Sequence, residues 1–231
     1  MVAPLGSPER PLRNDDLPAW IWTPTEKLIR VYHVHRDYSG RQHRVFGPLN
    51  RFDHQIRDGH QRPKTQPDGR GVIYLAETLG TALAEAFQEQ GVDVGVCPNM
   101  RAVAMAAPTA TALLDITGDG VMKIGAVAGL ASGAYPRRVT QRWARAIYED
   151  LGEFAGVRYR GAHQNGICIA AWERTGPLAF NSAEDFSLRS KTLWGRVVVA
   201  LADQGRAAER ITVGACPTCR CYGLKNRTTP R

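Results

Sequence analysis

The sequence predicts an α/β (α+β) fold in which helices pack around a mixed β-sheet. Segments with strand character and segments with helical periodicity follow one another in the order strand, long loop, strand–helix, strand, helix, strand, strand, helix. This order lacks the regular strand–helix repeat of a doubly wound parallel sheet. No G-x-G-x-x-G motif follows a strand, which argues against a dinucleotide-binding Rossmann domain. A chain of 231 residues suits one good-sized domain with extensions.

In the first half of the chain, "LIRVYHV" (28–34) alternates well enough to be the first strand. The polar stretch 35–70 is rich in glycine, proline and basic residues, and a loop of this length is more often functional than decorative. A strand over 72–75 follows. After it, apolar residues recur at intervals of three and four over 79–87, which predicts a helix.

In the second half, the alternation of strand and helix patterns continues. Thr140 is placed to cap the helix predicted over 140–150. Strands are predicted over 101–107, 111–117, 156–161 and 166–174, and a last helix over 188–204. We expect three parts: an N-terminal tail (1–26), a main domain (27–177), and a C-terminal helix with a basic, cysteine-containing tail (178–231).

Charge and composition limit the classes of partner. The net charge of +8 favours anionic partners, which include phosphorylated small molecules, nucleic acid and acidic proteins. The basic C-terminal segment lacks the interleaved aromatic residues of a single-strand binder, which disfavours nucleic acid without excluding it. No run of 18 apolar residues and no secretory signal is present, so we expect a cytoplasmic protein without membrane spans.

Two residues stand out as candidates for chemistry. Glu85 lies on the polar side of the helix 79–87, among small residues, where a solvated surface charge is the ordinary interpretation. Arg51 lies in the turn "FGPLNRFDH" (46–54), where a fixed guanidinium can present its planar fork to a phosphate or carboxylate. A surface pair with Asp53 explains Arg51 equally well at this point.

The cysteines and histidines suggest at most a structural metal. Five cysteines in a chain without a signal peptide argue against a disulfide scaffold. "CPTCRC" places Cys216, Cys219 and Cys221 at the spacing of a zinc half-site, with Cys97, Cys168 or a histidine to supply a fourth ligand. A flexible reduced tail is the alternative, and scattered loop residues are the better account of His33, His35 and their neighbours.

Taken together, "FGPLNRFDH", "GVIYLAETLGTALAEAF", "TQRWARAIYE" and "GVRYRGAHQNGICIAAWER" resemble the RES-domain family, over about residues 28–175. The family is named for an arginine, a glutamate and a serine, and is best known for toxins of toxin–antitoxin pairs that destroy NAD. Its strand tyrosine followed eleven residues later by a helix glutamate corresponds to Tyr74 and Glu85. Arg51 matches the family's arginine, and Arg30 a second basic position in the first strand. The resemblance implies a core similar to that of ADP-ribosyltransferases, with a cleft for bent NAD.

The resemblance also implies roles for individual residues. Glu85 would stabilise the oxocarbenium-like state formed when the nicotinamide–ribose bond breaks, with Arg51 and Tyr74 completing the catalytic set. Arg30 and Arg51 would neutralise the pyrophosphate, and Tyr74 would orient the nicotinamide. Where the family usually has its serine, this chain has Gly161, so the missing hydrogen bond would come from His163, Gln164 or a water.

Three functions therefore stay open at the level of sequence. The first is an NAD glycohydrolase or phosphorylase, held in check by a separate antitoxin protein if it is a toxin. The second is an ADP-ribosyltransferase that modifies a macromolecule. The third is a non-catalytic nucleotide-binding or interaction domain, which Gly161 favours because glycine has no hydroxyl.

Overall fold

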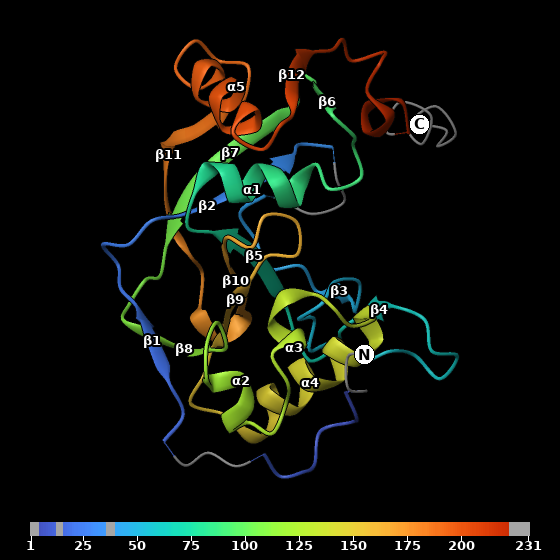
Figure 1. The fold of residues 1–231 in the computed structure, drawn as a ribbon, viewed down its shortest axis with the longest axis vertical. Helices are drawn as coiled ribbons and strands as arrows, with labels where there is room; N and C mark the ends of the chain where they lie inside the picture. The colour runs from blue at the N-terminus through green and yellow to red at the C-terminus, as the bar shows by residue number, and fades with distance from the viewer. Residues whose placement is uncertain (1–4, 13–15, 36–39, 222–231) are drawn as a thin grey trace.

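The computed structural model describes residues 5–12, 16–35 and 40–221. Its centre is a sheet of eight strands in the order β1-β8-β9-β10-β5-β2-β7-β11 (Figure 1). These strands are β1 (Ala19–Trp22), β2 (Leu28–His33), β5 (Val72–Ala76), β7 (Met100–Ala106), β8 (Thr111–Asp115), β9 (Gly156–Arg160), β10 (Ile167–Trp172) and β11 (Ala179–Ser187). The β8–β9 pair is parallel and the other neighbours are antiparallel. The predicted α/β architecture with a mixed sheet is confirmed.

Two short strand pairs flank this sheet. β3 (Phe46–Gly47) pairs antiparallel with β4 (Lys64–Thr65), so the stretch predicted as a long loop has a folded frame of its own. β6 (Asp93–Val96) pairs in parallel with β12 (Ala207–Arg210). The second pair joins the C-terminal segment to a strand more than a hundred residues earlier in the chain.

The helices lie in two groups at opposite ends of the sheet (Figure 1). α1 (Leu79–Ala86) packs against α5 (Trp194–Ala202) and against β2. α2 (Gly120–Lys123), α3 (Gly129–Ser132) and α4 (Arg137–Asp150) lie at the other end. Three clusters of buried apolar residues fill the spaces between the sheet and these groups, and Ile73, Leu83, Leu113 and Ile147 are among the fully buried side chains.

The strand–helix unit β5–α1 follows the predicted pattern closely. Four of the five β5 residues are buried, as expected of a strand inside a sheet. Thr78 caps α1, because its hydroxyl accepts a hydrogen bond from the Thr81 amide at 3.1 Å. Leu83 and Phe87 are buried in the core. Glu85 lies on the polar side of the helix and is half-buried.

Two details of the sequence prediction need correction. α4 begins at Arg137 with Pro136 in the capping position, so Thr140 is a buried residue inside the helix and its hydroxyl bonds to the Arg137 carbonyl at 3.0 Å. Within the segment expected to be a tail, β1 is paired with β8. Trp22 is fully buried there, and its indole N–H donates to the Glu26 carbonyl at 2.9 Å.

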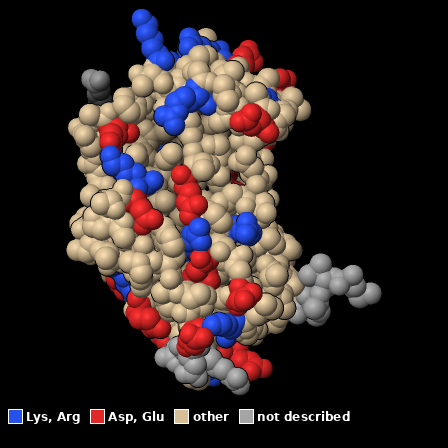
Figure 2. Space-filling view, turned by 60° about the vertical axis from the view of Figure 1, so that its left-hand side comes forward, with Lys and Arg blue, Asp and Glu red and all other residues tan. Residues whose placement is uncertain are grey.

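The surface carries mixed charge on the face shown in Figure 2. Lys and Arg side chains alternate there with Asp and Glu, and no continuous basic surface forms on that face. In the described parts of the chain, none of the helices has the length and apolar character needed to cross a bilayer.

Candidate active-site cleft

A cleft of about 1380 Å³ opens between the sheet, α1 and the loop that precedes α4. This volume exceeds the ~300–1,000 Å³ of ordinary small-molecule pockets. The walls bring together five of the residues singled out in the sequence, which come from β2, the 47–55 turn, β5, α1 and the β9–β10 hairpin. They are Arg30, Arg51, Tyr74, Glu85 and His163.

The turn that carries Arg51 is held by a buried carboxylate. Asp53 is fully buried and accepts hydrogen bonds from the Leu49 amide at 2.5 Å and the Asn50 amide at 2.9 Å. Its other partners are the Arg44 guanidinium at 2.5 Å and the Tyr74 hydroxyl at 2.7 Å. Asp53 therefore pairs with Arg44 and not with Arg51, which removes the surface-pair interpretation of Arg51.

Tyr74 links this turn to the sheet. Its hydroxyl donates to Asp53 and accepts from the Phe52 amide at 3.1 Å, directly beside Arg51. Burial, reinforced by the Asp53 charge, raises the pKa of Tyr74 well above its usual range, so the hydroxyl keeps its proton. The Tyr74 carbonyl in turn accepts from the Arg30 guanidinium at 3.2 Å. Tyr74 thus helps to place both arginines. Its carbonyl binds Arg30, and its hydroxyl binds the turn that carries Arg51.

Arg51 is fixed in the cleft wall by main-chain carbonyls. Its Nη2 donates to the carbonyls of Ala131 at 2.9 Å and Arg160 at 3.2 Å. Its guanidinium carbon lies 5.1 Å from the centre of the Tyr159 ring. Gly133, with φ of +82°, leaves room for Nη1, since a Cβ there would lie 2.4 Å from that atom. Among the described residues no carboxylate pairs with Arg51, so its charge is available to an anionic ligand.

Glu85 projects from α1 toward the β9–β10 hairpin. Its Oε1 accepts a hydrogen bond from the His163 amide at 3.3 Å, while the His163 ring contacts Gln88 Oε1 at 2.8 Å. A Cβ at Gly161 would lie 2.7 Å from the same Oε1. Position 161 therefore faces Glu85 directly, and the main-chain amide of His163 supplies a hydrogen bond where a serine hydroxyl is absent.

Two buried residues beside Glu85 were not expected there: Tyr159 was not singled out from the sequence, and Cys168, considered as a fourth metal ligand, lies here and not in the cysteine cluster. Burial raises the pKa of Tyr159 well above its usual range, and the neighbouring Cys168 adds to this. Burial, followed by the charge of Glu85, raises the pKa of Cys168 to about 12. At neutral pH Cys168 is a thiol and not a thiolate, so it lacks the reactive form of a nucleophile.

The partial positive charge at the start of α4 was also not predicted from the sequence. Tyr135, Pro136 and Arg137 line the cleft where this helix begins, and the start of a helix carries partial positive charge. The signal was the Tyr-Pro-Arg sequence, since proline favours the start of a helix. With Arg30 and Arg51, the start of α4 adds positive charge to the cleft that also holds the Glu85 carboxylate.

The cysteine motif near the C-terminus reaches the other end of the same cleft. Cys216 and Cys219 are buried beside Cys97 and His33, and one ligand atom from each lies within 4.8 Å of the others. Cys221, the third predicted metal ligand, is exposed and lies outside this group. The prediction is corrected at that residue, because the helical turn 217–221 directs Cys219 inward and Cys221 outward.

Comparison with protein-family models agrees with the resemblance drawn from the motifs. The family model described as "RES domain" matches residues 27–192, and the predicted resemblance is confirmed. The crystal structure of the M. tuberculosis MbcT–MbcA toxin–antitoxin complex aligns with this chain at 19% identity and a TM-score of 0.48, covering 78% of this chain and 90% of that one. No curated protein matches the chain.

Proposed function

Since this chain belongs to the RES-domain family, we propose that it is an NAD-degrading enzyme that cleaves the bond between nicotinamide and ribose. The observation that carries the proposal is the convergence of Arg30, Arg51, Tyr74 and Glu85 on one cleft large enough for a dinucleotide. The cleft offers both positive charge and a carboxylate, which suit an anionic pyrophosphate and a ribose carbon that becomes positively charged as neutral nicotinamide leaves.

The reaction requires different things of the carboxylate and of the basic groups in the cleft. When the C1′–N bond breaks, nicotinamide leaves with the bonding electrons and the ribose carbon becomes oxocarbenium-like. Glu85 offsets this developing positive charge, as a carboxylate does in glycosidases. Water then adds to C1′ in hydrolysis, with loss of a proton, or a phosphate oxygen adds in phosphorolysis. Arg30, Arg51 and the start of α4 balance the two charges of the pyrophosphate.

Tyr74 acts in this proposal as a positioning residue. Its hydroxyl is occupied by Asp53 and by the Phe52 amide, so it is not free to exchange protons with substrate. Its ring lines the cleft and can orient the nicotinamide by stacking. His163 holds the Glu85 carboxylate through its main-chain amide, and Gly161 leaves room for that carboxylate.

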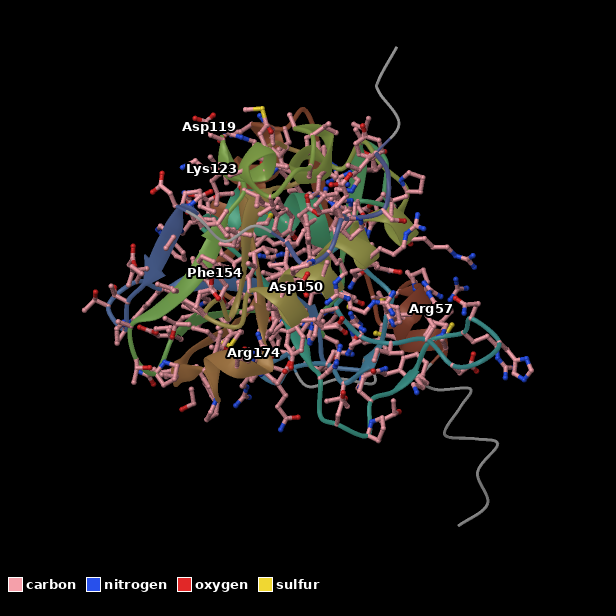
Figure 3. All side chains as sticks on the ribbon, turned by 90° about the horizontal axis from the view of Figure 1, so that it is seen from below. Arg57, Asp119, Lys123, Asp150, Phe154 and Arg174 are labelled. Atoms are coloured by element: carbon pink, nitrogen blue, oxygen red, sulfur yellow. The ribbon has the colours of Figure 1, made fainter. Side chains whose placement is uncertain are left out.

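The test is nicotinamide release from NAD by the purified full chain, with and without phosphate. We expect Glu85→Gln and Arg51→Ala each to lower the rate by a factor of ~10²–10³, as loss of one electrostatic group does in other enzymes. Asp119→Asn and Lys123→Ala are the matched controls, because both side chains are exposed at α2, at the outer edge of the molecule (Figure 3). Folding of each variant is checked by circular dichroism. Equal rates for all five proteins would refute the role of Glu85.

A second candidate, a nucleotide-binding domain without catalysis, is favoured by Gly161 alone. It predicts that NAD raises the melting temperature of the wild type while no nicotinamide is released. ADP-ribosyl transfer is tested with NAD that is labelled in its ADP-ribose part. If the label appears on protein or nucleic acid and not in free ADP-ribose, the acceptor is a macromolecule. A toxin role further predicts that expression arrests growth and that Glu85→Gln relieves the arrest, with a separate antitoxin protein as the natural inhibitor.

A further inference from the structure

Four buried side chains from three separate segments meet at one point beside the cleft. His33 is the last residue of β2, Cys97 follows β6, and Cys216 and Cys219 come from the C-terminal segment. The Nε2 atom of His33 lies 3.2 Å from the Cys219 sulfur, 3.4 Å from that of Cys97 and 3.6 Å from that of Cys216. The Cys97 and Cys219 sulfurs are 3.9 Å apart.

These distances are those of a tetrahedron of metal ligands. Zinc bonds of ~2.3 Å to sulfur and ~2.0 Å to nitrogen place two sulfurs about 3.8 Å apart and a sulfur and a nitrogen about 3.5 Å apart. The observed separations lie close to both values. A disulfide requires ~2.05 Å between sulfurs, so the Cys97–Cys219 separation does not fit a covalent bond.

We propose that His33, Cys97, Cys216 and Cys219 bind one Zn²⁺ as a structural site. Three thiolates and one imidazole form a soft donor set that suits zinc and excludes the oxygen-preferring Mg²⁺ and Ca²⁺. Four protein ligands fill the tetrahedron and leave no position for a substrate. On binding, Zn²⁺ replaces three thiol protons, which pass to solvent. The metal takes no chemical part in the reaction proposed above.

One neighbouring group fits this assignment, and another sets a condition on the proton of the His33 ring. The Asn99 side-chain amide donates to the Cys219 sulfur at 3.3 Å, as outer-sphere donors to zinc thiolates do. The His35 amide points at Nδ1 of His33 from 3.1 Å. Coordination through Nε2 needs the proton on Nδ1, so the His35 amide has to turn aside when zinc binds. His33 is therefore the ligand whose contribution must be tested by itself.

The metal would lock the C-terminal segment against the sheet. Pro217 and Thr218 line the cleft together with Glu85 and Arg51. The β6–β12 pair, the packing of α5 and a hydrogen bond from Arg189 to the Ile211 carbonyl at 2.9 Å also hold this segment. A zinc ion that joins β2, the residue after β6 and the helical turn 217–221 would fix one wall of the cleft. Without the metal, the end of the segment is held by apolar packing and by the hydrogen bonds of the Cys219 sulfur.

The first test is the metal content of the full chain purified from zinc-containing medium, by elemental analysis. We expect one zinc per chain, and a loss of affinity greater than about 100-fold in Cys97→Ser and Cys219→Ser, since even outer-sphere partners contribute ~10–100-fold. Cys221→Ser is the matched control, because it belongs to the same motif but is exposed. Loss of zinc from Cys221→Ser together with full retention in Cys97→Ser would overturn the proposed ligand set.

A second test starts from the wild type. Co²⁺ added to the chelator-treated wild type should give the intense visible bands of a tetrahedral site and a thiolate-to-cobalt charge-transfer band. Removal of the metal should make the segment 207–221 sensitive to limited proteolysis, and zinc should reverse this. His33→Gln should alter the cobalt spectrum; an unchanged spectrum refutes the imidazole ligand. If the wild type binds neither metal, the proposal is refuted even when every variant folds.

Discussion

Replacement of Asp53 by asparagine tests whether one buried carboxylate holds the turn that carries Arg51. Asp53 is fully buried, and it accepts hydrogen bonds from two main-chain amides, the Arg44 guanidinium and the Tyr74 hydroxyl. Asparagine keeps the shape and one oxygen, so the amides retain an acceptor. What it removes is the negative charge opposite Arg44, whose side chain is itself only 7% exposed.

The magnitude follows from this burial. Removal of one partner of a buried ion pair costs about 3–5 kcal/mol, because the other charge stays in a low-dielectric site without compensation. An exposed pair would cost about 0–1 kcal/mol. A domain of this kind has only ~5–15 kcal/mol of stability, so Asp53→Asn is expected to remove a large part of it. Arg44→Met in the same chain should recover part of the loss, since the buried charge that Asp53 had balanced is then gone.

The assay is urea unfolding followed by circular dichroism, with Asp119→Asn as the control for an exposed acidic residue. Nicotinamide release at a temperature where Asp53→Asn is still folded then reports on Arg51, which should bind substrate less well when its turn is loosened. A loss of less than about 1 kcal/mol in Asp53→Asn would refute the reasoning, because it would mean that Arg44 does not depend on this charge. Equal stability of the single and double variants would refute the coupling.

Two further predictions concern the room for a side chain at position 133 and the dependence of stability on pH. Gly133→Ala should destabilise the chain by about 1–2 kcal/mol or more in urea unfolding and lower NAD cleavage, because φ there is +82° and the new Cβ would meet the Arg51 guanidinium, whereas Gly152→Ala, in open space, should do neither. Burial lowers the pKa of His43 from 6.5 to about 4, so its protonation favours the unfolded chain. Its contribution is complete above pH 6.5 and is lost as the pH falls toward 4, a decline of at most about 3 kcal/mol that His43→Gln should flatten in pH-dependent melting curves. Glu173 adds a loss of its own at the lower edge of that window: hydrogen bonds outweigh its burial and lower its pKa from 4.5 to about 2, so its contribution to stability falls from about pH 4.5 downward.

Periodicity predicted the elements whose local pattern and burial agree. The β5–α1 unit, β2, β7 to β10 and α4 were all expected near their observed positions, because each alternates or repeats in the way its burial requires. The short pairs β3–β4 and β6–β12 were missed. Strands of two to four residues carry no readable period, and their stability comes from partners far away in the sequence.

Of the candidate site, only the residues that belong to a sequence motif could be predicted. Glu85, Arg51 and Tyr74 were found through the family resemblance and lie in one cleft. The Arg44–Asp53 pair could not be found, because nothing in the sequence says that these two charges are buried. Likewise the motif around Cys216 predicted a half-site, but only the fold shows that Cys97 and His33, and not Cys221, lie beside it.

The pairing of β12 with β6 also bears on how the protein is made. Synthesis is vectorial, so a nascent chain carries Arg51, Glu85 and His163 before the residues 207–221 that close one wall of the cleft exist. At ordinary rates of translation the delay is roughly 3–10 s. During that interval the cleft lacks the wall that residues 211–221 supply, so the site proposed for NAD is open on that side. A stop codon placed before residue 207 would have the same effect permanently, without touching any of the residues proposed to act on NAD.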